Sequence, residues 1–235
     1  MKIKKEKSVV LSLRPLSDFD GIVTLFGEET GLFRAVIRGI RRPKSRLCGI
    51  VQPFSEVISE WIPSRSENNL ARYIRAECIT HPPLSSDPIL LFLAEIAEKG
   101  TLEHSPDAQL YEMFRSVSVM RFPERLSGIF IVRLLSASGL LPSFSVCPHT
   151  KERHQKEGQW REDGAIVSSL FPGEAGIALS FSEIKTLCYW QEASLSISER
   201  IILSKESEQR LLHFLLTLLE HRHGIRLSSK ILLGL

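Results

Sequence analysis

The sequence lacks the motifs by which many catalytic and cofactor-binding sites are recognised. It contains no G-x-x-x-x-G-K-S/T loop, no G-x-G-x-x-G turn, no H-E-x-x-H pair and no G-x-S-x-G elbow. These absences leave phosphate-loop, dinucleotide, zinc-protease and serine-hydrolase chemistry without support. We therefore expect a protein that is not an enzyme and that needs no cofactor.

Cysteine and long apolar runs are also scarce. The 235 residues include four cysteines and no C-x-x-C pair, which excludes a disulfide framework and a strong zinc signature. No run approaches the roughly 20 apolar residues of a membrane span. The apolar stretch after the basic amino-terminal residues is too short for a secretory signal. We expect a soluble, cytoplasmic protein without a membrane partner.

One cluster of possible metal ligands remains. Cys147, His149 and His154 lie close together in the sequence, but a closed zinc site needs four ligands. No second Cys/His pair follows within the next 30 residues. We expect no metal, and a metal hydrolase built on these three residues is the enzyme alternative.

Acidic residues are missing from one stretch of the amino-terminal half. The first 80 residues carry a net charge of +5 and the remainder carries −2. Between Glu29 and Glu56 there is no acidic residue. Six basic residues fall in that stretch: Arg34, Arg38, Arg41, Arg42, Lys44 and Arg46. This asymmetry indicates that the basic half meets a polyanion.

The first 80 residues have the pattern of short strands and turns. Alternating, β-branched or aromatic residues predict five strands, over residues 8–13, 22–26, 32–39, 53–62 and 70–78. Residues 40–49 are a predicted loop, because Pro43 and the charges around it oppose a central strand. Five short strands in about 75 residues predict a small barrel or sandwich.

After residue 86 the apolar spacing becomes helical. Helices are predicted over residues 88–100, 107–120, 123–138 and 206–223, with another begun by the Ser180–Glu183 capping box. Residues 143–179 interrupt this pattern with polar and glycine-containing runs. We expect an α+β protein of two domains: a β domain over residues 1–80 and a helical domain over residues 81–235 with an irregular insertion at about 143–179.

The six basic residues are the candidate nucleic-acid site. Guanidinium groups bind phosphate bidentately, so a groove lined by them would follow a nucleic-acid backbone. The alternative is a solvated face whose charges are balanced by acids from elsewhere in the fold. Five aromatic residues of the same half could add base stacking: Phe19, Phe26, Phe33, Phe54 and Trp61. Of these, Phe33 lies on the strand face opposite Arg34 and Arg38, so we expect it in the core.

The order of these features resembles a known family. Residues 17–54 read SDFDGIVTLFGEETGLFRAVIRGIRRPKSRLCGIVQPF, residues 125–147 read RLSGIFIVRLLSASGLLPSFSVC, and residues 218–233 read LLEHRHGIRLSSKILL. The first segment resembles the amino-terminal domain of the bacterial recombination mediator RecO. The other two look like its helical domain, and the first segment is the most specific of the three.

The resemblance implies a fold and a function. It implies an OB-fold barrel followed by a helical domain, in a cytoplasmic, nucleoid-associated protein without catalytic activity. It implies binding of single- and double-stranded DNA, annealing of complementary strands, and loading of RecA onto strands coated by single-strand-binding protein (SSB). RecR and the acidic tail of SSB are the implied partners, and the six basic residues above are the implied DNA contacts. A general OB-fold binder of RNA or tRNA is the alternative function.

Two features of the helical half bear on partners and metals. Some family members carry a four-cysteine zinc module after the leucine–leucine–proline tract, but here Thr150 stands three residues after Cys147 and no later cysteine pair follows. We infer a zinc-free loop. An acidic peptide tail needs a cationic apolar groove. Arg125 and Arg133, eight residues apart on one predicted helix, are the candidates for binding the SSB tail.

Overall fold

Contacts between Cα atoms divide the computed structural model of the chain into two compact units. The first unit contains residues Met1–Pro123 and Leu227–Leu235, and the second contains Glu124–Arg226. The structure describes residues 2–64, 70–81, 88–118, 123–139, 141–161, 165–168, 176–198 and 200–229. Within these ranges, the side chains of residues 123–125, 195–196 and 221–223 are not described. The predicted domain boundary falls at residue 81 and the undescribed residues 82–87.

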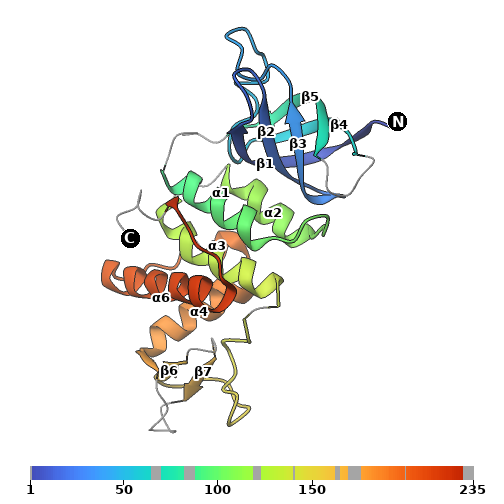
Figure 1. Ribbon diagram of the computed structural model, residues 1–235. Helices are drawn as coiled ribbons and strands as arrows, with labels where there is room; N and C mark the ends of the chain where they lie inside the picture. The colour runs from blue at the N-terminus through green and yellow to red at the C-terminus, as the bar shows by residue number, and fades with distance from the viewer. Residues whose placement is uncertain are drawn as a thin grey trace. The chain divides into compact units, whose positions relative to one another are not determined.

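The first unit contains the five predicted strands, closed into a barrel (Figure 1). The strands are β1 (Lys4–Pro15), β2 (Gly21–Gly27), β3 (Gly31–Ile37), β4 (Glu56–Ile62) and β5 (Ala71–Thr80). They follow one another around the barrel in the order β1-β2-β3-β5-β4, with only β3 and β5 paired in parallel. A closed five-stranded barrel of this kind is the OB-fold, which confirms the expected fold of this half.

Alternate residues of the strands fill the barrel interior. Val23 and Leu25 of β2 and Phe33 of β3 are at most 1% exposed and belong to one apolar cluster. The ring of Phe33 stacks on Trp61, with their centroids 4.4 Å apart. The prediction that Phe33 lies in the core is confirmed.

The outer face of β1, β2 and β3 is also buried, which the sequence pattern did not predict. Helices α1 (Pro88–Gly100) and α2 (Ala108–Val117) both pack against β1. Phe26 and Leu32, opposite one another on β2 and β3, are at most 1% exposed. Phe26 meets Phe114 of α2 edge to face, with centroids 5.0 Å apart. These two helices therefore complete the barrel's own fold.

A single buried carboxylate joins α1 to this outer face. Ser12, Thr24 and Arg34 lie side by side on β1, β2 and β3. Glu98 of α1 accepts hydrogen bonds from Ser12 Oγ at 2.9 Å and Thr24 Oγ1 at 3.3 Å. It also pairs with the guanidinium groups of Arg14 at 2.8 Å and Arg34 at 3.5 Å. The side chain of Glu98 is only 5% exposed, so its charge depends on these four donors.

The carboxy-terminal segment returns to the first unit and binds the same helix. Leu227 is 4% exposed. The backbone amides of Ser228 and Ser229 donate to the two carboxylate oxygens of Glu95, at 2.9 and 2.7 Å. Lys99 donates to Glu95 from one helical turn further along α1. Burial alone would raise the pKa of Glu95, but the hydrogen bonds from Lys99, Ser229 and Ser228 outweigh it and lower this pKa to about 2.

The second unit is helical, with a small sheet inserted. Its helices are α3 (Pro123–Ala137), α4 (Phe181–Glu192), α5 (Leu195–Ser198) and α6 (Lys205–His223). The segment that the sequence presents as irregular contains three short strands, β6 (Gly158–Trp160), β7 (Ile166–Ser168) and β8 (Ile177–Leu179), in the order β7-β6-β8. No helix in the described part of the chain has the length and apolar character needed to cross a bilayer.

Aromatic packing and one ion pair hold the second unit together. Trp160 of β6 is fully buried. Its ring centroid lies 5.4 Å from that of Phe144 and 4.0 Å from that of Phe214, which belongs to α6. The predicted capping box of α4 is confirmed, because Ser180 and Glu183 exchange hydrogen bonds. Glu183 also pairs with Arg210 of α6. The inserted sheet thus shares the core of the helices.

We expect Glu98→Ala to destabilise the first unit by about 3 kcal/mol. The change removes the buried carboxylate that pairs with the half-buried Arg34, and it leaves the hydroxyl groups of Ser12 and Thr24 without this acceptor. Chemical denaturation of the wild-type and variant chains measures the change. The matched control is Glu103→Ala, because Glu103 also pairs with Arg34 but its side chain is 50% exposed; its cost should stay below about 1 kcal/mol. Equal costs for the two variants would contradict the structural role of Glu98.

The attachment of the carboxy-terminal segment should depend on pH. The folded pKa of Glu95 lies below its ordinary value of 4.5, at about 2. The stabilisation is therefore complete above about pH 4.5 and declines as the pH falls from there towards 2. Protection of the Ser228 and Ser229 amides from hydrogen exchange, corrected for the intrinsic rate at each pH, should fall over this range. Glu95→Gln should abolish that pH dependence, and constant protection in the wild type would refute the prediction.

Candidate nucleic-acid interface

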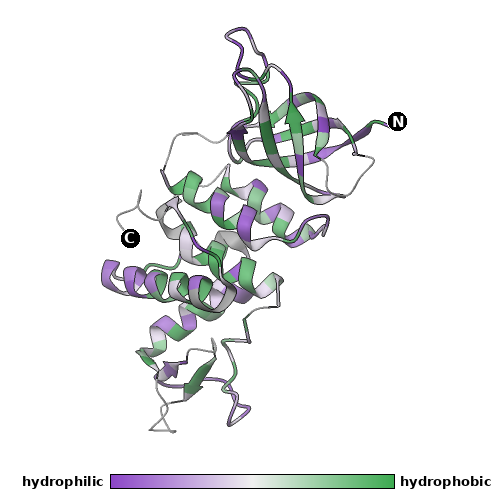
Figure 2. Ribbon diagram, viewed as in Figure 1, coloured by the Kyte–Doolittle hydropathy of each residue, from purple (hydrophilic) through white to green (hydrophobic). Residues whose placement is uncertain are grey.

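Five of the six basic residues predicted to bind nucleic acid lie on one loop at an end of the barrel. The basic loop, residues 38–46, follows β3 and precedes β4, and Figure 2 colours most of it hydrophilic. Apolar residues within it and just after it face the barrel: Ile40 and Val51 are 1% exposed, and Leu47 and Ile50 pack against the barrel core. The loop is therefore anchored by its apolar side chains while its cations face solvent.

Three hydrogen bonds join the basic loop to the turn between β1 and β2, residues 16–20. Gly39, at φ +68°, adopts a left-handed conformation that favours glycine, and its amide donates to the Asp20 carboxylate at 2.8 Å. The amide of Arg41 donates to the carbonyl of Phe19 at 3.0 Å, and its guanidinium donates to the carbonyl of Ser17 at 2.9 Å. The sequence showed a turn and a loop, but not that the two are joined.

The cations of the basic loop are exposed. All five have exposed side chains: Arg38, Arg41, Arg42, Lys44 and Arg46. Within the described residues, none of these five forms an ion pair with a carboxylate. Their mutual repulsion is thus left to solvent and counterions, as in surfaces that release counterions on binding a polyanion.

Arg34 differs from the other five residues. It lies within β3, and its side chain is 35% exposed. Its guanidinium pairs with Glu103 and with the buried Glu98. These are acids from elsewhere in the fold, which was the alternative interpretation of the basic residues. Arg34 therefore helps hold α1 on the barrel, and we leave it out of the DNA surface proposed below.

Only one of the five candidate stacking aromatics is displayed among the described residues. Phe26, Phe33, Phe54 and Trp61 are at most 3% exposed and belong to the interior of the first unit. Phe19, in the turn next to the basic loop, is 52% exposed. The guanidinium carbon of Arg42 lies 5.4 Å from the centre of its ring, within the range of a cation–π contact.

The two arginines predicted to bind a peptide tail have different environments. Arg133 of α3 donates to the carbonyl of Trp190 at 3.0 Å, to the carbonyl of Ala193, and to Ser198 Oγ at 3.2 Å. Burial lowers its pKa. These bonds satisfy the carboxy-terminal end of α4, so the polar end of Arg133 is committed within the fold. The side chain of Arg125 lies outside the described residues.

The possible metal ligands of the second unit form part of a tight loop. Cys147 is 1% exposed, and its amide donates to the carbonyl of Glu152 at 2.9 Å. His149 is exposed, while burial lowers the pKa of His154. In the described part of the chain, no three His, Cys, Asp or Glu side chains are placed to hold a metal ion. The fold of this loop is made by backbone hydrogen bonds.

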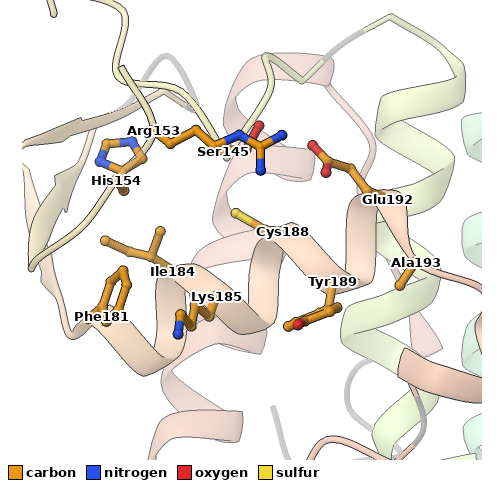
Figure 3. Close-up of a pocket in the computed structure, with 10 residues that line it drawn as sticks. All are labelled: Ser145, Arg153, His154, Phe181, Ile184, Lys185, Cys188, Tyr189, Glu192 and Ala193. Carbon is orange, nitrogen blue, oxygen red and sulfur yellow. The ribbon is translucent and has the colours of Figure 1, made fainter. Parts of the chain in front are cut away.

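The second unit also contains a pocket of about 370 Å³ beside α4. Figure 3 shows Arg153 and His154 on one side, opposite side chains of α4 that include Ile184, Cys188 and Glu192. Lys185 lies over the ring of Phe181, 4.6 Å from its centre. Burial, followed by the charge of Glu192, raises the pKa of Cys188 to about 11, so the thiol stays protonated. The pocket is thus lined by apolar side chains together with two cations, Arg153 and Lys185, and one carboxylate, Glu192.

We expect Arg133→Ala to destabilise the second unit by about 2 kcal/mol, because it leaves part-buried carbonyl groups at the carboxy-terminal end of α4 without a donor. Arg200→Ala is the matched control, because Arg200 is an exposed arginine of the same unit; its cost should be below about 0.5 kcal/mol. Urea denaturation of both variants provides the comparison. An Arg133→Ala chain as stable as the control would show that the three hydrogen bonds contribute little.

Comparison with known proteins yields matches along nearly the whole chain. The family model described as "Recombination protein O N terminal" matches residues 1–82, and the model described as "Recombination protein O C terminal" matches residues 89–231. A DNA repair protein RecO from Symbiobacterium thermophilum is 27% identical over 98% of this chain and 96% of its own length. Proteins of the same name from Syntrophus aciditrophicus and Bacillus subtilis are 25% and 24% identical, over 96% and 97% of this chain and 93% and 92% of their own.

Proposed function

The chain belongs to the RecO family of DNA repair proteins, and we propose that its basic loop binds the sugar–phosphate backbone of DNA. The observation that carries this proposal is the set of five exposed cations on residues 38–46 that form no ion pair within the described residues. Among the described residues, no carboxylate has to be released before these cations reach a phosphate. Backbone contacts of this kind position a nucleic acid without reading its sequence, which suits a protein that must act on any strand.

The covered strand face supports the choice of this loop. Many OB-folds bind oligonucleotides on the outer face of their second and third strands. Here Phe26 and Leu32 on that face are buried, and Thr24 and Arg34 bond with Glu98 of α1. DNA could use that face only by displacing the helix. The basic loop and the turn of residues 16–20 offer a surface that needs no such rearrangement.

Membership of the family supports a proposal for the finer activity. We infer that the protein anneals complementary strands and helps load RecA onto strands coated by SSB, without catalytic turnover. Holding the backbone through cations at the end of the barrel leaves the bases free to pair with a second strand. RecR and SSB are the protein partners that this activity requires.

The tail of SSB needs a receptor with cations above an apolar floor. Arg133 is a poor candidate, because its guanidinium already donates to Trp190, Ala193 and Ser198. The pocket beside α4 offers two cations, Arg153 and Lys185, next to the apolar side chains of Phe181 and Ile184, although Glu192 also lines it. We therefore propose this pocket as the receptor for the tail.

The DNA proposal predicts a specific response to salt. If five phosphates are contacted, the logarithm of single-strand affinity should fall with the logarithm of salt concentration at a slope of about −3.5. Replacing Arg38, Lys44 and Arg46 by alanine removes three of the cations and should reduce the slope to about −1.4. Fluorescence anisotropy with a labelled oligonucleotide over a range of salt concentrations measures both values.

A matched triple variant distinguishes a local surface from net charge. Lys156, Arg200 and Lys205 are exposed residues of the second unit, and their replacement by alanine changes the net charge of the chain by the same amount. This control should keep the wild-type slope. The proposal fails if the two triple variants lose the same affinity or if the basic-loop variant keeps its slope. Titration with RNA of matched sequence tests the alternative of a general RNA binder.

A further inference from the structure

Phe19 is an exposed aromatic ring next to the charged side chains of the basic loop. It is 52% exposed, whereas the other four candidate aromatics of the first unit are at most 3% exposed. Its neighbour Leu16 is 51% exposed, so the turn between β1 and β2 presents apolar groups to solvent. An exposed ring beside unpaired cations is typical of surfaces that bind single-stranded nucleic acid.

The backbone that carries the ring is fixed by hydrogen bonds before any ligand arrives. The amides of Leu16 and Ser17 donate to the carbonyl of Asp20 at 3.0 and 3.3 Å, which closes the turn. The carbonyl of Phe19 itself accepts from the amide of Arg41 at 3.0 Å. The guanidinium of Arg42 lies over the ring. Little conformational entropy is lost when a ligand meets a group that is already ordered.

The chemistry around the ring favours an uncharged aromatic partner. The half-exposed ring offers an apolar aromatic surface, which fits the face of a nucleobase and not a charged phosphate. The cations of the basic loop attract the backbone nearby. A nucleobase on the ring and its phosphates along residues 38–46 would satisfy both groups.

We propose that Phe19 stacks on an unpaired base and thereby makes the basic loop bind single-stranded DNA in preference to duplex. In a duplex each base is stacked within its own strand and presents only its edges in the grooves. A single strand offers a free base face, and every base has one, so the contact is independent of sequence. This inference rests on the proposed function of the basic loop and names the form of DNA that the loop selects.

The test is the affinity of Phe19→Ala for a single strand and for a duplex of the same sequence. Loss of one stacked base should weaken single-strand binding by roughly 5- to 150-fold. Duplex affinity should change less than about twofold, and the salt slope should be unchanged because no cation is removed. Unchanged single-strand affinity, or an equal loss for both forms of DNA, would overturn the proposal.

Three further variants separate stacking from apolar area and from folding. Leu16→Ala removes a side chain of similar exposure from the same turn and should leave both affinities unchanged. Phe19→Leu keeps an apolar side chain but removes the ring, so it should behave as Phe19→Ala does. Phe19→Trp keeps an aromatic ring at this position and should keep the single-strand affinity of the wild type. Equal effects of Leu16→Ala and Phe19→Ala would instead assign the loss to apolar area and reject stacking.

The failures of the two proposals can be told apart. If replacing Arg38, Lys44 and Arg46 weakens binding of both DNA forms while Phe19→Ala does not discriminate between them, the stacking inference alone is wrong. If the triple variant binds both forms as the wild type does, the basic loop is not the DNA surface. Thermal unfolding of each variant, expected to match the wild type within a few degrees, checks that the barrel is intact.

Discussion

The buried carboxylate of Glu98 is the interaction on which the arrangement of the first unit depends. It accepts from Ser12 and Thr24 and pairs with Arg14 and Arg34, so it meets all three strands of one barrel face. A buried carboxylate is tolerable only when its lone pairs are used. Glu98 therefore fixes where α1 lies, and with α1 in place the outer strand face is closed to other ligands.

That constraint divides the arginines of the first unit into two groups. Arg14 and Arg34 lie on the outer strand face, where both form ion pairs with Glu98 of α1. Arg34 also pairs with Glu103, which follows α1. The arginines of the basic loop lie at the end of the barrel, where the described residues offer them a carbonyl of Ser17 and a ring of Phe19. Only the second group keeps its charge available, because a carbonyl or a ring does not neutralise a cation as a carboxylate does.

The five strands and the main helices could be predicted from the sequence, whereas the contacts between them could not. Alternating, β-branched or aromatic residues identified the five strands, and the capping residues identified the start of α4, because these signals are local. The burial of Phe26 and Leu32 on the outer face of the barrel was not predicted, because it depends on α1 and α2, which follow much later in the sequence. The same limit explains Arg34. Its partners Glu98 and Glu103 are distant in the chain, so an acid-free stretch of sequence did not imply an acid-free surface.

The basic loop could be predicted only in part from the sequence. Its charges were visible in the sequence, but its apolar anchors Ile40 and Val51 and its attachment to Phe19 appear only when the barrel closes. Anchoring matters for function, because a flexible loop loses conformational entropy when its cations bind a ligand, whereas an anchored loop loses less. The side chains that fill the barrel thus also prepare its charged end, and the fold and the proposed DNA surface are stabilised by the same residues.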